Sequence, residues 1–184
     1  KNISICEIGG GYGHLANALM RTRITNKYLI IDFPQVLDIV NRWTLNTKPD
    51  FQVFFHKNIE DFDKNSQSLG LHLLSNELFY SLKNKINFDL GINVNSFGEM
   101  TTNQVENYIN GERLGINILY SNNQSVQPNN FELEPLSKLF KKYSKVTPNY
   151  TEQINKGVTF KKYVHLLYFK DYLSFEEVNI NNLS

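Results

Sequence analysis

The chain has 184 residues, of which 41% are hydrophobic and 20% charged, a composition that fits one ordinary domain and excludes a disordered segment. The formal net charge is +1, so the strong basic excess of duplex-DNA binders is missing. The single cysteine, Cys6, excludes a disulfide within the chain and suits a reducing compartment. It lies in an apolar run and is best interpreted as a small buried hydrophobe.

The hydrophobic pattern predicts strands alternating with helices. Strands are expected over residues 3–8, 28–31, 51–55, 88–94 and 116–120, with one or two more within 158–169. Helices are expected over about 14–24, 34–43, 69–82, 101–114 and 136–143, with a polar loop at 121–130. This alternation predicts a Rossmann-like, doubly wound, mostly parallel α/β sheet.

No stretch approaches the roughly 20 apolar residues that span a bilayer, and no signal peptide is visible. We therefore expect a cytoplasmic protein without a membrane span. The chain begins at Lys1, with the first strand expected almost at once, so we expect a piece of a longer protein that lacks an N-terminal region. We expect one domain over residues 1–184, with a frayed tail from about residue 176.

A glycine-rich turn follows the first strand, in the run Glu7-Ile8-Gly9-Gly10-Gly11-Tyr12-Gly13-His14. Such a turn lets a ligand approach the backbone closely, in front of a helix N-terminus. A dinucleotide motif requires a third glycine where this chain has His14. The acidic-x-Gly-x-Gly-x-Gly pattern instead resembles motif I of the class I S-adenosylmethionine-dependent methyltransferases. The resemblance implies that Glu7 helps to hold the methionine amino group, and a carboxylate there would repel a pyrophosphate.

Asp32 closes the second strand, about 20 residues after the glycines, where a carboxylate can accept both ribose hydroxyls of an adenosine. Its alternative role is to cap the helix that begins near Pro34. Phe33 is a further cofactor-binding candidate. Both nucleoside cofactor classes use an acid at this place, so Asp32 supports adenosine binding without choosing between them.

Asparagines follow the third strand and end the fourth. In the methyltransferase fold, residues after the third strand often flank the adenine, which makes Asn58 and Ile59 candidates; Asn58 is alternatively an ordinary turn residue. Asn93 and Asn95 end the fourth strand and should border the ligand crevice at the carboxyl edge of the sheet.

Methyl transfer to an alcohol requires a group that removes or polarises its proton. Glu99, after the fourth strand, is the first candidate; its alternative role is a carboxylate favourable to the helix that starts near Thr101. His56, after the third strand, is the second candidate. His165 lies in an apolar run and is better explained as a core residue. The sequence has no convincing metal-ligand spacing, so we assign no metal site, although ligands from separate loops stay an alternative.

The chain also resembles a bacterial family of sugar O-methyltransferases. The matching stretches are Glu7 to Gly13, Tyr28 to Leu37, and Phe88 to Met100 with its Ser-Phe-Gly-Glu-Met ending. The resemblance implies a seven-stranded sheet of the class I methyltransferase type, S-adenosylmethionine as cofactor, and a sugar or glycan-precursor hydroxyl as methyl acceptor. The fourth strand lacks the Asn/Asp-Pro-Pro-Tyr/Phe signature of nucleobase methyltransferases, so we expect no nucleic-acid substrate.

Two alternatives stay open from the sequence. One is an NAD-dependent sugar dehydrogenase or epimerase, and the other is a non-catalytic scaffold with a methyltransferase-like fold. The oligomeric state is not indicated by the sequence.

Overall fold

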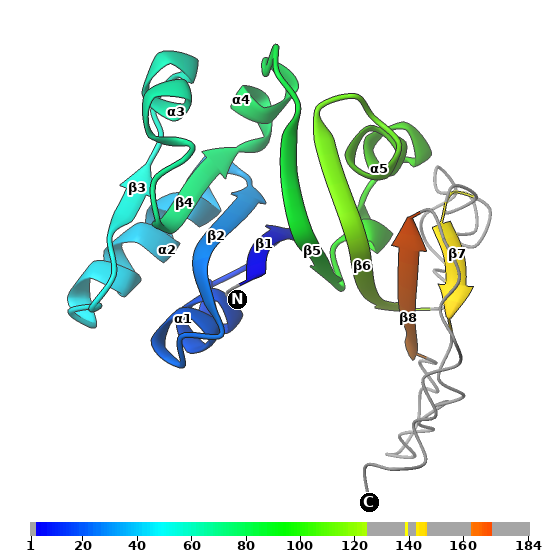
Figure 1. Ribbon diagram of the computed structural model, residues 1–184, viewed down its shortest axis with the longest axis horizontal. Coiled ribbons are helices and arrows are strands. Elements are labelled where there is room, and N and C mark those ends of the chain that lie inside the picture. The colour runs from blue at the N-terminus through cyan, green and yellow to red at the C-terminus, as the bar shows by residue number, and fades with distance from the viewer. Residues whose placement is uncertain (1–2, 125–138, 140–142, 147–162, 171–184) are drawn as a thin grey trace, which may run out of the picture.

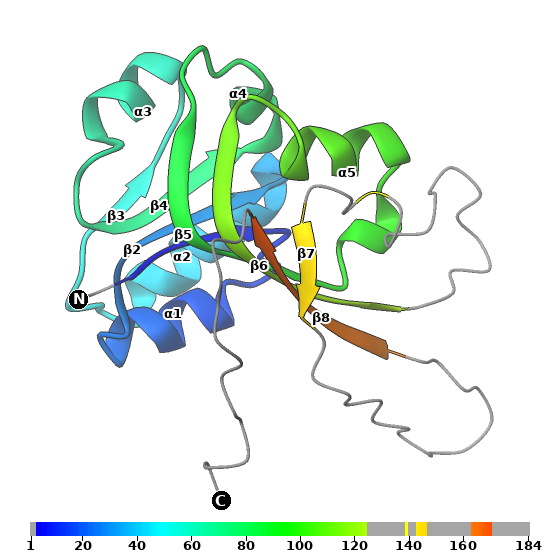
Figure 2. The same cartoon turned by 45° about the vertical axis from the view of Figure 1, so that its right-hand side comes forward.

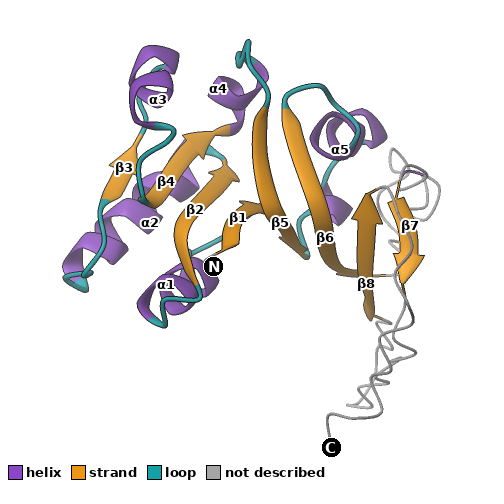
Figure 3. Cartoon of the chain, viewed as in Figure 1, coloured by secondary structure: helices purple, strands orange, loops and turns teal. Residues whose placement is uncertain are grey.

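The computed structural model describes residues 3–124, 139, 143–146 and 163–170 (Figure 1). Within these residues, eight strands form one sheet in the order β3-β4-β2-β1-β5-β6-β8-β7 (Figure 3). The bounds are β1 Ile3–Ile8, β2 Thr25–Asp32, β3 Val53–Phe55, β4 Gly70–Ser75, β5 Ile86–Val94, β6 Leu114–Gln124, β7 Tyr143–Val146 and β8 Tyr163–Lys170. The six strands from β3 to β6 in this order are parallel, while β8 runs antiparallel to both β6 and β7.

Helices cover both faces of the sheet, with α1 and α2 on one face and α3, α4 and α5 on the other (Figure 2). Their bounds are α1 His14–Arg21, α2 Pro34–Asn46, α3 Ile59–Asn65, α4 Asn76–Tyr80 and α5 Thr102–Ile109, with a short 3-10 turn η1 at Phe97–Glu99. None of the described helices is long and apolar enough to cross a bilayer.

Two hydrophobic clusters hold these layers together. Ile5, Tyr28 and Ile30 face α1 and α2, whereas Cys6 and Leu29 belong to the cluster that includes α3, α4 and α5. Successive residues of β1 and β2 thus point to opposite faces, and both faces are buried. This is why these strands read as nearly continuous apolar runs, as is usual for central parallel strands.

The helix starts follow local sequence signals. Pro34 occupies the first turn of α2, where its fixed φ and missing N–H cost nothing. Thr101 caps α5 in a capping box: its hydroxyl accepts from the Gln104 N–H, and the Gln104 side chain accepts from the Thr101 N–H. The prediction that a threonine at 101 or 102 starts this helix is confirmed.

The α/β alternation and the parallel sheet are confirmed, but several predicted elements are wrong. The helix predicted over 69–82 is instead the buried strand β4 followed by the five-residue α4, because a short apolar run has no distinguishing period. Within the described residues the sheet has eight strands, where seven were predicted. β6 continues to Gln124, through the start of the predicted loop. The helix predicted over 136–143 lies almost entirely outside the described residues, as does the tail from 176.

Candidate functional site

The strand order changes direction at β1, which lies between β2 and β5. The carboxyl ends at such a switch point form the usual ligand crevice of doubly wound sheets. A crevice of about 330 Å³ lies there. Residues after β1, β2, β4 and β5, together with η1 and α5, line it: Gly9, Gly11, Ile31, Asp32, Phe33, Val36, Asn76, Tyr80, Val94, Asn95, Ser96, Glu99, Met100, Gln104 and Tyr108.

The glycine turn forms one wall of the crevice, and two of its glycines are required for different reasons. A Cβ on Gly9 would overlap the Ser96 side chain, so Gly9 is fixed by packing. A Cβ on Gly11 would meet nothing within 4 Å, and its φ is +52°. Gly11 therefore presents bare backbone to open space, which allows a ligand to approach closely. Gly13 ends the turn as the left-handed N-cap of α1.

Asp32 is bound to the glycine turn. Its Oδ2 accepts from the Gly11 N–H at 3.1 Å, and its Oδ1 accepts from the Phe33 N–H at 2.7 Å. Burial raises the pKa of Asp32, the hydrogen bonds from backbone N–H groups lower it, and Glu99 raises it by charge repulsion. The half-buried carboxylate is thus oriented within the crevice by the backbone.

Glu7 does not line the crevice. It is 4% exposed and lies behind the turn, where its Oε2 accepts from the Tyr28 hydroxyl at 2.9 Å. A Cβ on Gly10 would come within 3.2 Å of the same oxygen. The pKa of Glu7 is raised to about 7, chiefly by burial. The hydrogen bond from Tyr28 lowers this pKa, and the nearby charge of Asp32 raises it further. Glu7 therefore supports the turn from inside the fold.

Asn93 is buried below the crevice and joins three strands. Its Nδ2 donates to the Ile8 carbonyl at 2.9 Å, and its Oδ1 accepts from Asn123 Nδ2 at 2.8 Å. Ser96 also donates to Ile8 O, at 2.9 Å, and lies within hydrogen-bond range of Asn93. Asn95 lines the crevice with a φ of +59°. Asn93 is thus a structural cross-link, while Asn95 lies on the wall itself.

Asn58 and Ile59 follow β3, which lies beyond β4 and does not touch β2. The strand that pairs with β2 is β4, and Asn76 follows it directly. Asn58 caps α3 by accepting from the Asp61 N–H at 2.8 Å, and neither Asn58 nor Ile59 lines the crevice. Asn76 does line it, and its Oδ1 is buried without a hydrogen-bond partner. The sequence interpretation missed Asn76 because it placed β4 inside a helix. The buried run Gly70–Ser75 followed by a Ser75 cap is the signal that could have located it.

His56 lies among aromatic rings away from the crevice lining. His72 Nε2 lies 2.9 Å from the Ser68 carbonyl, which only accepts, so this nitrogen carries the proton. His56 Nε2, 3.0 Å from His72 Nδ1, therefore donates to it. Burial lowers the pKa of both histidines, that of His72 to about 4. His56 is 2% exposed, so this geometry gives it no access to a substrate.

Glu99 lies on the crevice with an exposed side chain, at the end of η1 and just before the Thr101 cap of α5. Aromatic side chains that the sequence did not single out border the same crevice. Tyr108 is stacked on Phe79 at 4.9 Å between ring centroids, and Tyr80 lies 5.9 Å from Tyr108. Among the described residues, no three His, Cys, Asp or Glu side chains are grouped so as to hold a metal ion.

Comparison with solved structures identifies the fold. The methyltransferase domain of the bacterial Hen1 protein CtHen1-CN matches with a TM-score of 0.60 at 13% identity, over 90% of this chain and 89% of that one. A TehB-like S-adenosylmethionine-dependent methyltransferase from Corynebacterium glutamicum matches with a TM-score of 0.55 at 12% identity, over 93% and 82%. The fold of the present chain is therefore that of the S-adenosylmethionine-dependent methyltransferases.

A third similar structure carries a ligand. TrmK from M. capricolum, in complex with S-adenosylhomocysteine, matches with a TM-score of 0.53 at 16% identity, over 95% of this chain and 66% of that one. The sequence itself matches no protein-family model and no curated protein.

Proposed function

We propose that the protein is an S-adenosylmethionine-dependent O-methyltransferase that transfers a methyl group to a hydroxyl of a sugar or glycan precursor. One observation carries the cofactor part: the bare backbone of Gly11 and the carboxylate of Asp32 meet at the switch point of a methyltransferase fold, joined by a 3.1 Å hydrogen bond. The S-adenosylhomocysteine complex of TrmK supports the same assignment.

The crevice fits the adenosine part of this cofactor. Asp32 would accept the ribose hydroxyls, since its backbone hydrogen bonds orient the carboxylate. Asn76 Oδ1 is a buried acceptor without a partner, which normally costs free energy unless a ligand donates to it. The amino group of adenine is such a donor. Phe33 and Tyr80 supply apolar surface for the ring.

The crevice also fits a cofactor with a net positive charge. Asp32 and Glu99 are both on its lining. A dinucleotide would place its pyrophosphate beside these acids and be repelled. This arrangement favours the sulfonium nucleoside over NAD. When bound, S-adenosylmethionine supplies the electrophilic methyl group.

Glu99 is the proposed base, because it is the exposed carboxylate on the lining and can accept a proton from an acceptor hydroxyl. We propose no catalytic role for His56, which is buried elsewhere. Within the described lining there is no lysine, arginine or histidine to pair with a phosphate. A neutral saccharide therefore fits the described part of the crevice better than a nucleic acid does.

Ligand-induced stabilisation tests the cofactor assignment. Saturating S-adenosylhomocysteine should raise the melting temperature, because a ligand selective for the native state must stabilise it. NADH at equal concentration should not. Asp32→Ala should weaken S-adenosylhomocysteine binding by about 1–3 kcal/mol, as for a lost hydrogen bond to a charged group, with the fold intact by circular dichroism. A shift with NADH alone would replace the proposal by the dehydrogenase alternative.

The acceptor requires a separate test. Transfer of a radiolabelled methyl group to a panel of neutral saccharides, with product mapping by mass spectrometry, should give an O-methylated sugar. Glu99→Gln should lower kcat while leaving S-adenosylhomocysteine affinity near the wild-type value. Cofactor binding without turnover on any acceptor would support the non-catalytic scaffold.

A further inference from the structure

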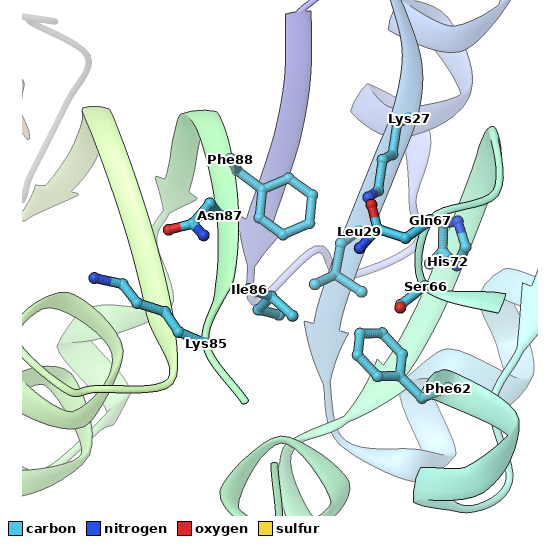
Figure 4. Close-up of a pocket in the computed structure, with 10 residues that line it drawn as sticks. All are labelled: Lys27, Leu29, Phe62, Ser66, Gln67, His72, Lys85, Ile86, Asn87 and Phe88. Atoms are coloured by element: carbon cyan, nitrogen blue, oxygen red, sulfur yellow. The ribbon is translucent and has the colours of Figure 1, made fainter. Parts of the chain in front are cut away.

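Figure 4 shows a second cavity, of about 160 Å³. It lies near the amino ends of the parallel strands, whereas the crevice lies at their carboxyl ends. It is lined near the amino ends of β2 and β5 and by the segment that leads from α3 into β4. The only helix between β4 and β5 is the five-residue α4, which begins directly at the carboxyl end of β4. No helix of the β4–β5 connection therefore covers the sheet face near the amino ends of β2 and β5.

The cavity lining combines apolar side chains with polar ones. Leu29 of β2, Phe62 of α3, and Ile86 and Phe88 of β5 line it. A cavity of about 150 Å³ with apolar walls is large enough to hold a benzene ring. The volume and these four apolar side chains suit a ligand with one ring or a short branched aliphatic group that also carries a polar head.

One cation is held at this cavity. Lys27 is half-buried, its Nζ lies 5.7 Å from the centroid of the Phe88 ring, and burial lowers its pKa. Among the described residues no carboxylate forms an ion pair with Lys27, and none of the lining side chains is acidic. A partly desolvated ammonium without a counter-ion is unfavourable, and an anion supplied by a ligand would relieve that cost.

The second lysine on the lining is differently placed. Lys85 is exposed and extends away from the cavity (Figure 4), and its Cε lies close to Gly115 of β6. The cavity therefore offers one inward cation. The other polar groups on its lining belong to Ser66, Gln67, His72 and Asn87.

We propose that this cavity is a binding site for a small carboxylate with an apolar body, such as an aryl or branched aliphatic acid, whose carboxylate pairs with Lys27. The site is separate from the cofactor crevice, since the two share no lining residue. Its occupation does not depend on the methyltransferase assignment.

Benzoate is the probe, and amide chemical shifts of the full chain in NMR titrations are the readout, with and without saturating S-adenosylhomocysteine. We expect saturable shifts around Leu29, His72 and Phe88, and an affinity for benzoate at least tenfold higher than for neutral benzamide. Lys27→Met should lower benzoate affinity at least tenfold, whereas Lys27→Arg should retain most of it.

Lys85→Met is the matched control, because it removes a lysine charge from the same rim, and it should bind benzoate within about twofold of wild type. Melting temperatures of all variants report folding, and Lys27→Met should melt no lower than wild type, since it removes a desolvated charge. The proposal is overturned if benzamide binds as tightly as benzoate, or if Lys27→Met binds benzoate as tightly as wild type. It is also overturned if both methionine variants lose the same benzoate affinity, or if the shifts are confined to the glycine turn.

Discussion

The Ser96 side chain occupies the space where Gly9 would carry a Cβ, so the turns after β1 and β5 interlock. The Ser96 hydroxyl donates to the Ile8 carbonyl, immediately before Gly9. The wall of the crevice thus depends on a contact between segments nearly ninety positions apart.

Gly9→Ala should destabilise the protein by about 2 kcal/mol or more, through overpacking and a methyl group at a positive φ. The double variant Gly9→Ala/Ser96→Gly removes the overlap and should recover at least about 1 kcal/mol relative to the sum of the single variants. Urea unfolding of all four proteins measures this coupling. Additive losses would mean that the two segments do not share this space.

Asn76 and Asn58 should behave differently. Asn76→Ala should weaken S-adenosylhomocysteine binding by about tenfold while changing stability little, because it removes an acceptor that has no partner within the protein. Asn58→Ala should leave binding near wild type and cost about 1 kcal/mol of stability, since it removes the α3 cap. Isothermal titration and thermal unfolding separate the two effects. The reverse pattern would restore the assignment of the adenine site to Asn58.

Much of this site could be predicted from the sequence, and the errors of that prediction have a common physical origin. The Glu7–Gly13 pattern and Asp32 indicate the turn and its carboxylate, since both depend on local backbone requirements. Asn76 was missed because β4 is buried on both faces and has no period that distinguishes it from a helix. The burial of His56 depends on His72, sixteen residues away, and no local pattern indicates such a pairing.

Glu7→Gln should stabilise the protein increasingly as pH rises from about 4.5 to 7. The pKa of Glu7 is raised to about 7 in the fold, so the native state binds more protons than the unfolded state within this window, and wild-type stability falls as pH rises. The variant lacks this loss and gains up to about 3 kcal/mol above pH 7. Thermal unfolding of both proteins from pH 4 to 8 measures the difference. A difference that is constant with pH would show that the Glu7 carboxyl titrates normally.

His72 should make the stability of the protein depend on pH in the opposite direction. Its pKa is lowered to about 4, so between pH 6.5 and 4 the unfolded state binds the extra proton and stability falls as pH falls. His72→Gln should remove up to about 3 kcal/mol of this acid sensitivity, so its stability relative to wild type should improve from pH 6.5 to pH 4. His14→Gln, at an exposed residue stacked on Trp43, is the matched control for the loss of a histidine ring. A His72→Gln profile parallel to that of wild type would show that the pKa of His72 is not lowered in the fold.

The hydrogen bonds of Asn93 have a consequence for how the chain folds during synthesis. They join β5 to residue 8 and to residue 123, so the floor of the crevice requires three strands that emerge at widely separated times. Contacts of such long sequence separation are costly to close and tend to form slowly. Nascent chains that end before β6 should therefore lack cofactor affinity even where β1 and β2 have already paired, and ligand capture would report completion of the sheet.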